Sequence, residues 1–322
     1  MIKAVILFVI GLVLLIKGGD WFVDGASKIA ERFHIPEILI GATVVSIGTT
    51  LPEVMVSATS AAKGIGAMAY GNAIGSIICN TALISAITIA VMPADVEKKS
   101  LRFPVLCFFI AAIFYVFNAY AFGGFSRISG IILLAMFVAY MIIIVMQAFK
   151  TPGAPTDNQE SSDNKDPIWK DIVLLIVGAA LIAVGADLLV DNGTIIATEL
   201  GVPASVIALT FVALGTSLPE LVTAITSLIK GHGALSLGNV IGANIFNIVL
   251  VSGMSITIAP FKVPVEKTIA GMNASLIMDI PVMLFVMSLL TVPALITGKL
   301  KRYQGVILLS VYVVYCVAQF VL

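Results

Sequence analysis

Two copies of one short polar motif lie within apolar sequence. The first is Gly-Thr-Thr-Leu-Pro-Glu at residues 48–53, and the second is Gly-Thr-Ser-Leu-Pro-Glu at 215–220. Each copy ends in a glutamate, Glu53 or Glu220, and lies in a stretch long enough to cross a bilayer. A carboxylate at membrane depth costs about 2.5–3.5 kcal/mol on insertion scales, so such residues usually bind an ion or relay protons. We therefore interpret both glutamates as cation ligands.

A proline directly precedes each glutamate, at Pro52 and Pro219. Proline removes a backbone donor and strains the turn before it, so we expect each helix to break just before its glutamate. A break frees backbone carbonyls one turn upstream, which makes those of Ser46 and Ala213 candidate ligands. Hydroxyls beside such a break are interpreted as ligands rather than as helix back-bonding groups; they are Thr49, Thr50, Thr216 and Ser217.

A second polar group follows each motif by about twenty residues. In the first copy it comprises Asn72, Gly75, Ser76 and Asn80, and in the second Asn239, Gly242, Ala243 and Asn247. Ser76 and Asn80 are four residues apart and so share a helix face. We predict that Asn80 and Asn247 belong to the cation site, together with Ser76. Asn72 and Asn239 are interpreted as caps or hinges.

Glycines accompany these asparagines at a spacing of four residues. Gly71 with Gly75, and Gly238 with Gly242, are expected to let their helices approach a neighbour closely.

Charge balance narrows the choice of cation. Two carboxylates neutralise one divalent cation or two monovalent ones. Six or more oxygens from carboxylates, hydroxyls, amides and carbonyls suit Ca²⁺ better than Mg²⁺, which retains its waters. No cysteine or histidine joins the predicted site, which disfavours soft transition metals.

The composition explains how charged motifs come to lie at membrane depth. The chain has 322 residues, of which 60% are hydrophobic and 11% charged, with a mean hydropathy of +1.11. Soluble domains are nearer half apolar and a quarter charged. We predict an all-α polytopic membrane protein with ten transmembrane helices, near residues 4–31, 37–63, 69–92, 102–122, 128–149, 170–196, 204–229, 235–258, 274–296 and 303–322.

An internal duplication relates the two motifs. Shifting the chain by 167 residues aligns Glu53 with Glu220 without a gap, and 24 of the 55 pairs between 36–90 and 203–257 are identical. The predicted domains are a five-helix repeat at 1–150, a cytoplasmic linker at 151–167, and a second five-helix repeat at 168–322. An odd number of spans per repeat means that the second is inverted, with a broken core helix in each, the plan of secondary transporters.

Lysine and arginine positions fix the expected orientation. With both termini outside, thirteen basic residues fall on the internal side and five on the external side, as the positive-inside rule requires. We expect a multi-pass protein of the cell membrane, the inner membrane in a Gram-negative bacterium.

Other functions find little support in the sequence. The three cysteines lie in apolar runs, which argues against disulfides or a metal cluster. No Ser/His/Asp set or His/Glu metal set suggests an intramembrane hydrolase, so we expect no enzyme activity and no cofactor. The net charge of zero offers no basic patch for nucleic acid. The expected partners are the lipid bilayer and the transported ions, without an obligate protein partner.

The paired motifs, each followed by Gly-Asn-x-Ile-Gly and then a further asparagine, resemble the alpha-repeats of the cation/calcium antiporter superfamily. The bacterial and archaeal sodium/calcium exchangers are the closest branch, and the resemblance covers essentially the whole chain. It implies exchange of external Na⁺ for Ca²⁺ by alternating access. It further implies that the motif glutamates bind Ca²⁺ and share Na⁺ sites with hydroxyls; the matching positions are Glu53, Glu220, Thr49, Thr50, Thr216, Ser217, Ser76 and Asn80.

Two positions depart from that family pattern. Ala243 lacks the hydroxyl that Ser76 supplies in the first repeat, and Asn247 is an amide where some prokaryotic relatives carry aspartate. We therefore expect one Na⁺ site to be weaker, and the Na⁺ stoichiometry is not carried over.

Three functions remain to be weighed on the sequence alone. A Na⁺/Ca²⁺ antiporter is favoured. The alternative is a H⁺/Ca²⁺ antiporter, in which the two glutamates would exchange protons. A passive cation channel would conduct without a counter-ion gradient, and paired broken helices argue against it.

Overall fold

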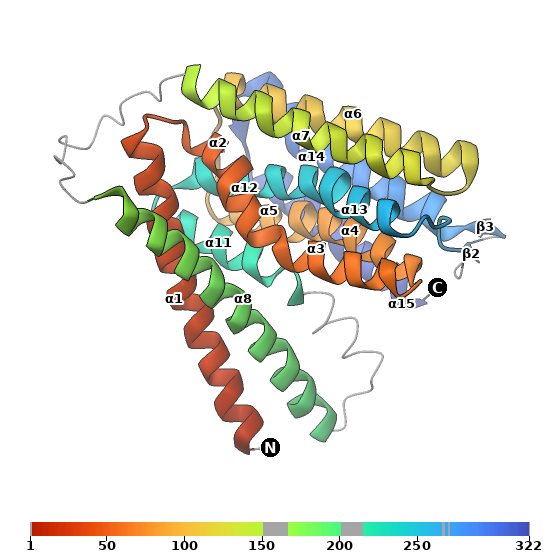
Figure 1. The fold of residues 1–322 in the computed structure, drawn as a ribbon, viewed down its shortest axis with the longest axis horizontal. Coiled ribbons are helices and arrows are strands. Elements are labelled where there is room, and N and C mark those ends of the chain that lie inside the picture. Colours follow the sequence, from red (N-terminus) through yellow and green to blue (C-terminus); the bar gives the residue numbers. More distant parts are fainter. Residues whose placement is uncertain (1, 151–166, 201–214, 266–267, 270, 322) are drawn as a thin grey trace. The chain divides into compact units, whose positions relative to one another are not determined.

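The computed structural model describes residues 2–150, 167–200, 215–265, 268–269 and 271–321, and these residues are almost entirely helical (Figure 1). In chain order the elements are α1 (Ile2–Arg32), α2 (Glu37–Ile40), η1 (Gly41–Val45), α3 (Ser46–Ala62), α4 (Gly66–Cys79), η2 (Asn80–Ile84), α5 (Ser85–Val91), β1 (Ala94–Asp95), α6 (Lys98–Phe122), α7 (Arg127–Lys150), α8 (Ile168–Glu199), α11 (Leu218–Ile229), α12 (Gly233–Phe246), η4 (Asn247–Val251), α13 (Ser252–Ile258), β2 (Thr268–Ile269), β3 (Met272–Asn273), η5 (Ser275–Asp279), α14 (Ile280–Thr297), β4 (Lys299–Leu300) and α15 (Arg302–Val321). Segments labelled η are π-helical.

Eight helices in the described part of the chain are long and apolar enough to cross a membrane, judged by length and composition. They match eight of the ten predicted spans to within a few residues. The tenth predicted span corresponds to α15. The seventh, 204–229, lies partly outside the described residues, which include only its end, α11. The chain is thus a polytopic helical protein, as predicted.

The chain forms two compact units that do not coincide with the two sequence repeats. The first unit comprises Met1–Thr49 and Met146–Asn239, and the second comprises Thr50–Val145 and Val240–Leu322. Each unit therefore takes segments from both halves of the duplication. The boundary passes through both polar regions, between Thr49 and Thr50 and between Asn239 and Val240.

Helices α1 and α8 pack side by side along much of their length in the first unit (Figure 1). At Gly178 of α8, a Cβ atom would lie 2.5 Å from the backbone nitrogen of Phe22 in α1. Only glycine permits backbones to approach so closely, which is how membrane helices gain van der Waals contact. A helix of the first sequence repeat, α1, thus packs against a helix of the second, α8.

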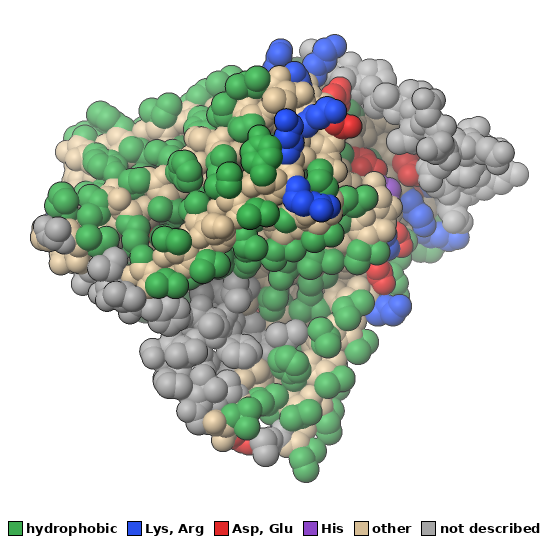
Figure 2. All heavy atoms as spheres, turned by 180° about the vertical axis from the view of Figure 1, so that it is seen from behind, with side chains coloured by type: hydrophobic (Ala, Val, Ile, Leu, Met, Phe, Trp, Pro, Cys, Tyr) green, Lys and Arg blue, Asp and Glu red, His purple; other side chains and the backbone are tan. Residues whose placement is uncertain are grey.

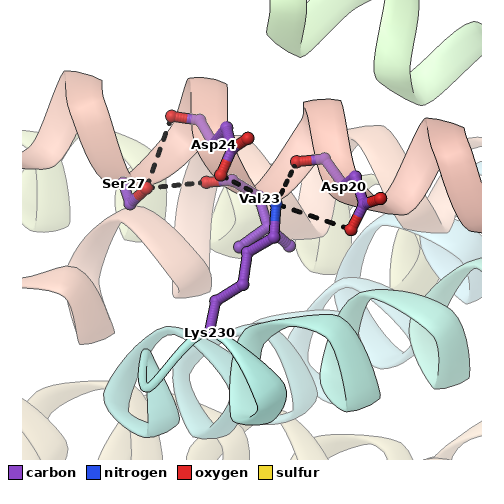
Figure 3. A network of polar contacts seen from close by, with 5 residues as sticks. All are labelled: Asp20, Val23, Asp24, Ser27 and Lys230. Atoms are coloured by element: carbon purple, nitrogen blue, oxygen red, sulfur yellow. Dashed lines mark hydrogen bonds and ion pairs between the residues drawn. The ribbon is translucent and has the colours of Figure 1, made fainter.

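Ion pairs join the ends of helices in the first unit. Lys230, which follows α11, donates from Nζ to the carbonyl oxygen of Asp20 (2.9 Å) and to Oδ1 of Asp24 (2.8 Å) in α1 (Figure 3). His232, before α12, lies with Nδ1 2.6 Å from Oε1 of Glu37 at the start of α2. The hydrogen bond that His232 donates to the Glu37 carboxylate raises the pKa of His232 above its usual value, because it favours the charged imidazolium. These contacts fix α11 and α12 against α1 and α2.

The second unit contains the remaining spans and two short strand pairs. Its packing brings Val54 of α3, Ala73 of α4 and Val251 of η4 into one buried cluster. Strand β1 pairs antiparallel with β4, and β2 with β3. The first pairing holds the loop before α6 against the loop before α15.

Two π-helical segments mirror each other across the duplication. Segment η2 begins at Asn80 and η4 begins at Asn247, positions that differ by the repeat shift of 167 residues. A π-helical turn accommodates one extra residue and is common at functional sites. The matched positions indicate that both repeats retain this local geometry around their predicted site asparagine.

Hydrophobic side chains cover much of the visible surface, and few charged side chains interrupt them (Figure 2). Several of the most exposed large residues lie on the outer faces of long helices, among them Ile113 and Phe122 of α6 and Val314 of α15. Soluble monomers rarely expose such extensive apolar area, so this surface is suited to lipid.

Candidate functional site

The two motif glutamates are completely buried, each in its own unit. Glu53 lies in the middle of α3 in the second unit, and Glu220 lies in the first turn of α11 in the first unit. Neither side chain has measurable solvent exposure. Burying an ionised carboxylate is expensive unless it is paired or coordinates a metal, so both positions require a charge partner or a cation.

The predicted helix break is wrong in the first motif. Helix α3 runs from Ser46 to Ala62 with Pro52 inside it. Neighbouring turns evidently hold the helix in place despite the missing donor, as membrane helices often do. In a continuous helix the carbonyl that loses its donor to Pro52 is four residues upstream, at Gly48 rather than Ser46.

In the second motif a helix begins just before the glutamate, as predicted, while residues 201–214 lie outside the described part of the chain. Ser217 has φ −93° and ψ 5°, outside the helical region, and α11 begins at Leu218 with proline in its first turn. This start places Glu220 among the free amides of a helix N-terminus, where negative charge is stabilised by roughly 0.3–1 kcal/mol. The two motifs thus share a sequence but differ in backbone geometry.

Several predicted ligands of the second unit carry buried oxygen atoms that lack a hydrogen-bond partner. They are Oγ1 of Thr50, Oδ1 of Asn80 and Oδ1 of Asn247. The amide nitrogen of Asn247 donates to the carbonyl of Ala243 at 3.0 Å, which leaves its oxygen as the free end. Ser76 is also buried. Buried polar atoms are nearly always satisfied in native proteins, so these oxygens are suited to a ligand.

Asn72 braces the helix that carries Glu53. Its Nδ2 donates to the backbone carbonyl of Glu53 (3.2 Å) and to Oγ of Ser57 (2.7 Å). The prediction that Asn72 is a cap is wrong, because it lies inside α4. Its side chain instead satisfies two acceptors on α3 and fixes the glutamate backbone relative to α4.

Asn239 has a corresponding role in the first unit and is likewise not a cap, since it lies inside α12. Its Oδ1 accepts from Oγ1 of Thr49 at 3.2 Å and from Oγ of Ser46 at 3.3 Å. Ser46 also contacts the backbone carbonyl of Gly41 at 2.7 Å. Thr49 thereby commits its proton to Asn239, and its oxygen lone pairs remain available to a cation.

Three predicted site residues of the first unit remain, and the structure describes two of them. Ser217 is buried, and its Oγ has no hydrogen-bond partner. Thr216 lies in the turn before α11. Ala213 lies outside the described residues.

Two further hydroxyl residues were missed from the sequence. Thr223 and Ser227 follow Glu220 on α11, and both are fully buried with unpartnered hydroxyl oxygens. Their spacing of three and seven residues after Glu220 was the available signal, since it places them on its helix face.

A separate polar contact occupies the second unit. Asn244 donates from Nδ2 to Oγ1 of Thr81 at 2.7 Å and lies 3.3 Å from the sulfur of Met287. Neither Asn244 nor Thr81 has a polar counterpart across the duplication, where Ile77 and Ile248 stand. This contact joins α12 to η2 and α14. The aligned positions of the other repeat cannot form it.

The chemistry of the predicted residues is that of a hard cation. Carboxylate, hydroxyl and amide oxygens are the ligands that Ca²⁺ and Na⁺ prefer over soft metals. Within the described residues, no group of three or more histidine, cysteine, aspartate or glutamate side chains could hold a metal. A resident transition-metal centre of that kind is therefore absent from the described part of the chain.

Comparison with known proteins gives one consistent family. The profile described as sodium/calcium exchanger protein matches residues 3–146 and 170–321. A protein of Alkalimonas amylolytica named as a candidate antiporter, CaxA, is 36% identical over 323 residues, covering 98% of each chain. The sodium/calcium exchanger MaX1 of Methanosarcina acetivorans is 31% identical over 358 residues, again covering 98% of each.

A solved structure shows the same similarity in three dimensions. The sodium-calcium exchanger NCX_Mj, soaked with Na⁺ and Sr²⁺, superimposes with a TM-score of 0.81 at 32% sequence identity. The match covers 97% of both chains.

Proposed function

The chain belongs to the sodium/calcium exchanger protein family, and on this premise we propose that it exchanges Na⁺ for Ca²⁺ across the membrane by alternating access. Its relatives are membrane exchangers by name, and the chain is a multi-pass membrane protein with many apolar helices. The proposed architecture is ten transmembrane helices in two inverted five-helix repeats, the arrangement that supports alternating access in secondary transporters.

The buried oxygen atoms of the two motif regions are the observation that carries this proposal. Two fully buried carboxylates accompany hydroxyl and amide oxygens that have no hydrogen-bond partner. A desolvated cation would supply the missing partner for these atoms and the charge for the carboxylates. The proposed ligands are the side chains of Glu53, Glu220, Thr49, Thr50, Thr216, Ser217, Ser76, Asn80 and Asn247, with the carbonyls of Ser46 and Ala213.

Exchange follows from the charge of these residues. Two ionised glutamates balance either one Ca²⁺ or two Na⁺, so the two substrates compete for the same negative charge. A site loaded with neither carries a larger net negative charge than a loaded site, in an environment where an unbalanced charge is costly. That cost opposes reorientation of the empty protein and couples the movement of one ion to the other.

Counter-ion dependence is the experiment that tests this function. The purified protein is reconstituted in proteoliposomes loaded with Na⁺, and ⁴⁵Ca²⁺ uptake is followed after dilution into Na⁺-free medium at fixed pH. We expect uptake that requires the Na⁺ gradient and stops when Na⁺ is equal on both sides. Uptake driven by a pH gradient without Na⁺ would identify a H⁺/Ca²⁺ antiporter, and uptake without any gradient would identify a channel.

The proposed topology places both termini outside and the segment 151–167 in the cytoplasm, a segment almost entirely outside the described residues. The thirteen-to-five distribution of basic residues supports it. In a cysteine-free background, Ser161→Cys is expected to react with a membrane-impermeant maleimide only after the cells are opened. Reaction in intact cells would reverse the orientation.

A further inference from the structure

Helix α11 carries a polar face that extends beyond the motif glutamate. Thr223 and Ser227 follow Glu220 by three and seven residues. At about 100° per residue, both lie within roughly 60° of Glu220 around the helix. All three side chains are fully buried, so this face is polar although it does not meet solvent in this structure.

The hydroxyls of Thr223 and Ser227 do not donate to the backbone of their own helix. Hydroxyls on other helices donate to the carbonyl four residues earlier, as Thr43 does to Leu39 (2.7 Å) and Ser255 to Val251 (2.8 Å). Among the residues that the structure describes, neither Thr223 Oγ1 nor Ser227 Oγ has a hydrogen-bond partner. A buried hydroxyl that forgoes even this local bond is suited to bind a water or an ion.

Helix packing on α1 does not explain these hydroxyls. The α1-facing side of α11 is formed by Val222 and Thr226, which lie against Gly19: a Cβ there would be 2.6 Å from Cγ1 of Val222. Around the helix, Thr223 and Ser227 lie about 60–140° from Val222 and Thr226. The duplication adds a distinction, because Ser227 aligns with Ser60 whereas Thr223 aligns with Val56. The Thr223 hydroxyl is thus peculiar to the second repeat.

The polar face leads to a negatively charged group at the end of α11. Lys230 is three residues beyond Ser227 and contacts Asp24 at 2.8 Å and the Asp20 carboxylate at 3.5 Å (Figure 3). Two carboxylates and one ammonium leave a net charge of −1 when all are ionised. The lysine therefore does not repel cations from this end of the helix, since its charge is more than balanced.

Distances along the helix fit a stepwise route. Glu220 to Lys230 spans ten residues, or about 15 Å at 1.5 Å per residue, about half the roughly 30 Å hydrocarbon thickness. Thr223 and Ser227 divide that span into steps of about 4–6 Å. Such steps allow a cation to exchange some of its waters for protein oxygens at each position.

From these observations we propose that Thr223 and Ser227 line a hydrated passage for Na⁺ and Ca²⁺, leading from Glu220 to the Asp20–Asp24–Lys230 group. The inference rests on the proposed function, because it assumes that Glu220 binds the transported cation. The two hydroxyls contact the ion while it moves through the passage, where they replace part of its hydration shell. They do not set the equilibrium affinity of the site at Glu220 for the cation.

The first test combines Thr223→Val, which makes the position match Val56, with Ser227→Ala. We expect the initial rate of counter-ion-driven ⁴⁵Ca²⁺ exchange to fall about tenfold, while the Ca²⁺ dissociation constant of the purified protein changes less than twofold. Thr226→Val, on the α1-facing side of the same helix, is the matched control and should leave the rate within twofold. An unchanged exchange rate in the double variant would overturn the proposal of a passage.

The second test does not depend on exchange activity and so separates this inference from the proposed function. Thr223→Cys and Ser227→Cys, made separately in a background lacking Cys79, Cys107 and Cys316, are treated in membranes with a small cationic methanethiosulfonate. We expect both to react, more slowly when Ca²⁺ is present. Ile182→Cys, at a buried apolar position of α8, should not react. If Thr223→Cys and Ser227→Cys react no faster than Ile182→Cys, the passage does not exist.

Discussion

Glu53→Gln and Glu220→Gln are each expected to abolish Ca²⁺ transport while leaving the protein folded. Glutamine preserves the shape of the side chain and removes its charge at a fully buried position. Removing one partner of a buried charge interaction typically costs about 3–5 kcal/mol. This corresponds to a loss of roughly 100- to 4,000-fold in Ca²⁺ affinity.

The measurement is Ca²⁺ binding by calorimetry together with ⁴⁵Ca²⁺ flux, with thermal melting as the check on folding. Glu37→Gln is the matched control, because Glu37 is only partly buried and pairs with His232 at a helix end. That variant should retain Ca²⁺ binding. Near-normal flux in either motif variant would show that two carboxylates are not needed and would remove the basis for the proposed cation site.

Gly238→Ala is expected to destabilise the protein, whereas Gly71→Ala at the repeat-equivalent position is not. A Cβ atom at Gly238 would lie 2.2 Å from the carbonyl oxygen of Ile38 and 2.9 Å from its carbonyl carbon. Because both are backbone atoms, relief requires α2 and α12 to separate. Overpacking of this kind costs about 1–3 kcal/mol or more. At Gly71 no atom of the described residues lies within 4 Å of an added Cβ, and alanine there gains about 1 kcal/mol of helix propensity.

Thermal unfolding in detergent compares the two variants directly. The separation of α2 from α12 should also weaken the contacts of Ser46 and Thr49 with Asn239, which lies one residue after Gly238. We therefore expect Gly238→Ala to lower cation affinity in addition to stability. Equal melting temperatures for the two variants would contradict the close approach at Gly238.

Hydropathy and duplication were sufficient to predict most of the helical plan. Apolar segments of spanning length are strong signals, because the bilayer imposes both length and composition. The repeat shift of 167 residues also anticipated the paired geometry at Asn80 and Asn247, although not its π-helical form. A π-helical turn depends on tertiary packing that rewards one extra residue, and no local sequence pattern specifies it.

Local rules failed where the neighbouring helices decide the outcome. The same Leu-Pro-Glu string continues a helix at Pro52 and begins one at Pro219. Proline inside a helix costs about 3 kcal/mol. Packing against neighbouring helices determines whether the helix continues in spite of that cost. Likewise, Gly71 and Gly238 both begin a Gly-Asn-x-Ile-Gly string, and within the described residues only Gly238 of the two meets a backbone at close range. The expectation of close packing was confirmed at Gly238, whereas at Gly71 and Gly75 no atom of the described residues lies within 4 Å of an added Cβ.

Side-chain roles were least predictable for residues that form hydrogen bonds with residues distant in the sequence. Asn72 and Asn239 were interpreted as caps or hinges, yet the side chain of each forms hydrogen bonds with a residue on another helix. Their hydrogen-bond partners are separated from them by 15–19 residues for Asn72 and by 190–193 residues for Asn239. A single sequence does not specify such pairs. Thr223 was overlooked because a threonine in an apolar helix is usually satisfied by its own backbone.

The interleaving of the two units has a consequence for biosynthesis. Helix α1 packs on α8, yet about 150 residues are translated between Gly18 and Gly178, positions at which the two helices meet. At typical elongation rates of about 5–20 residues per second, α1 waits roughly 8–30 s for its partner. During that interval the face of α1 that will meet α8 is bordered by lipid or by the insertion machinery. The contact between α1 and α8 therefore forms only after the second half of the chain has been made, although α1 can already pack against α2 and η1.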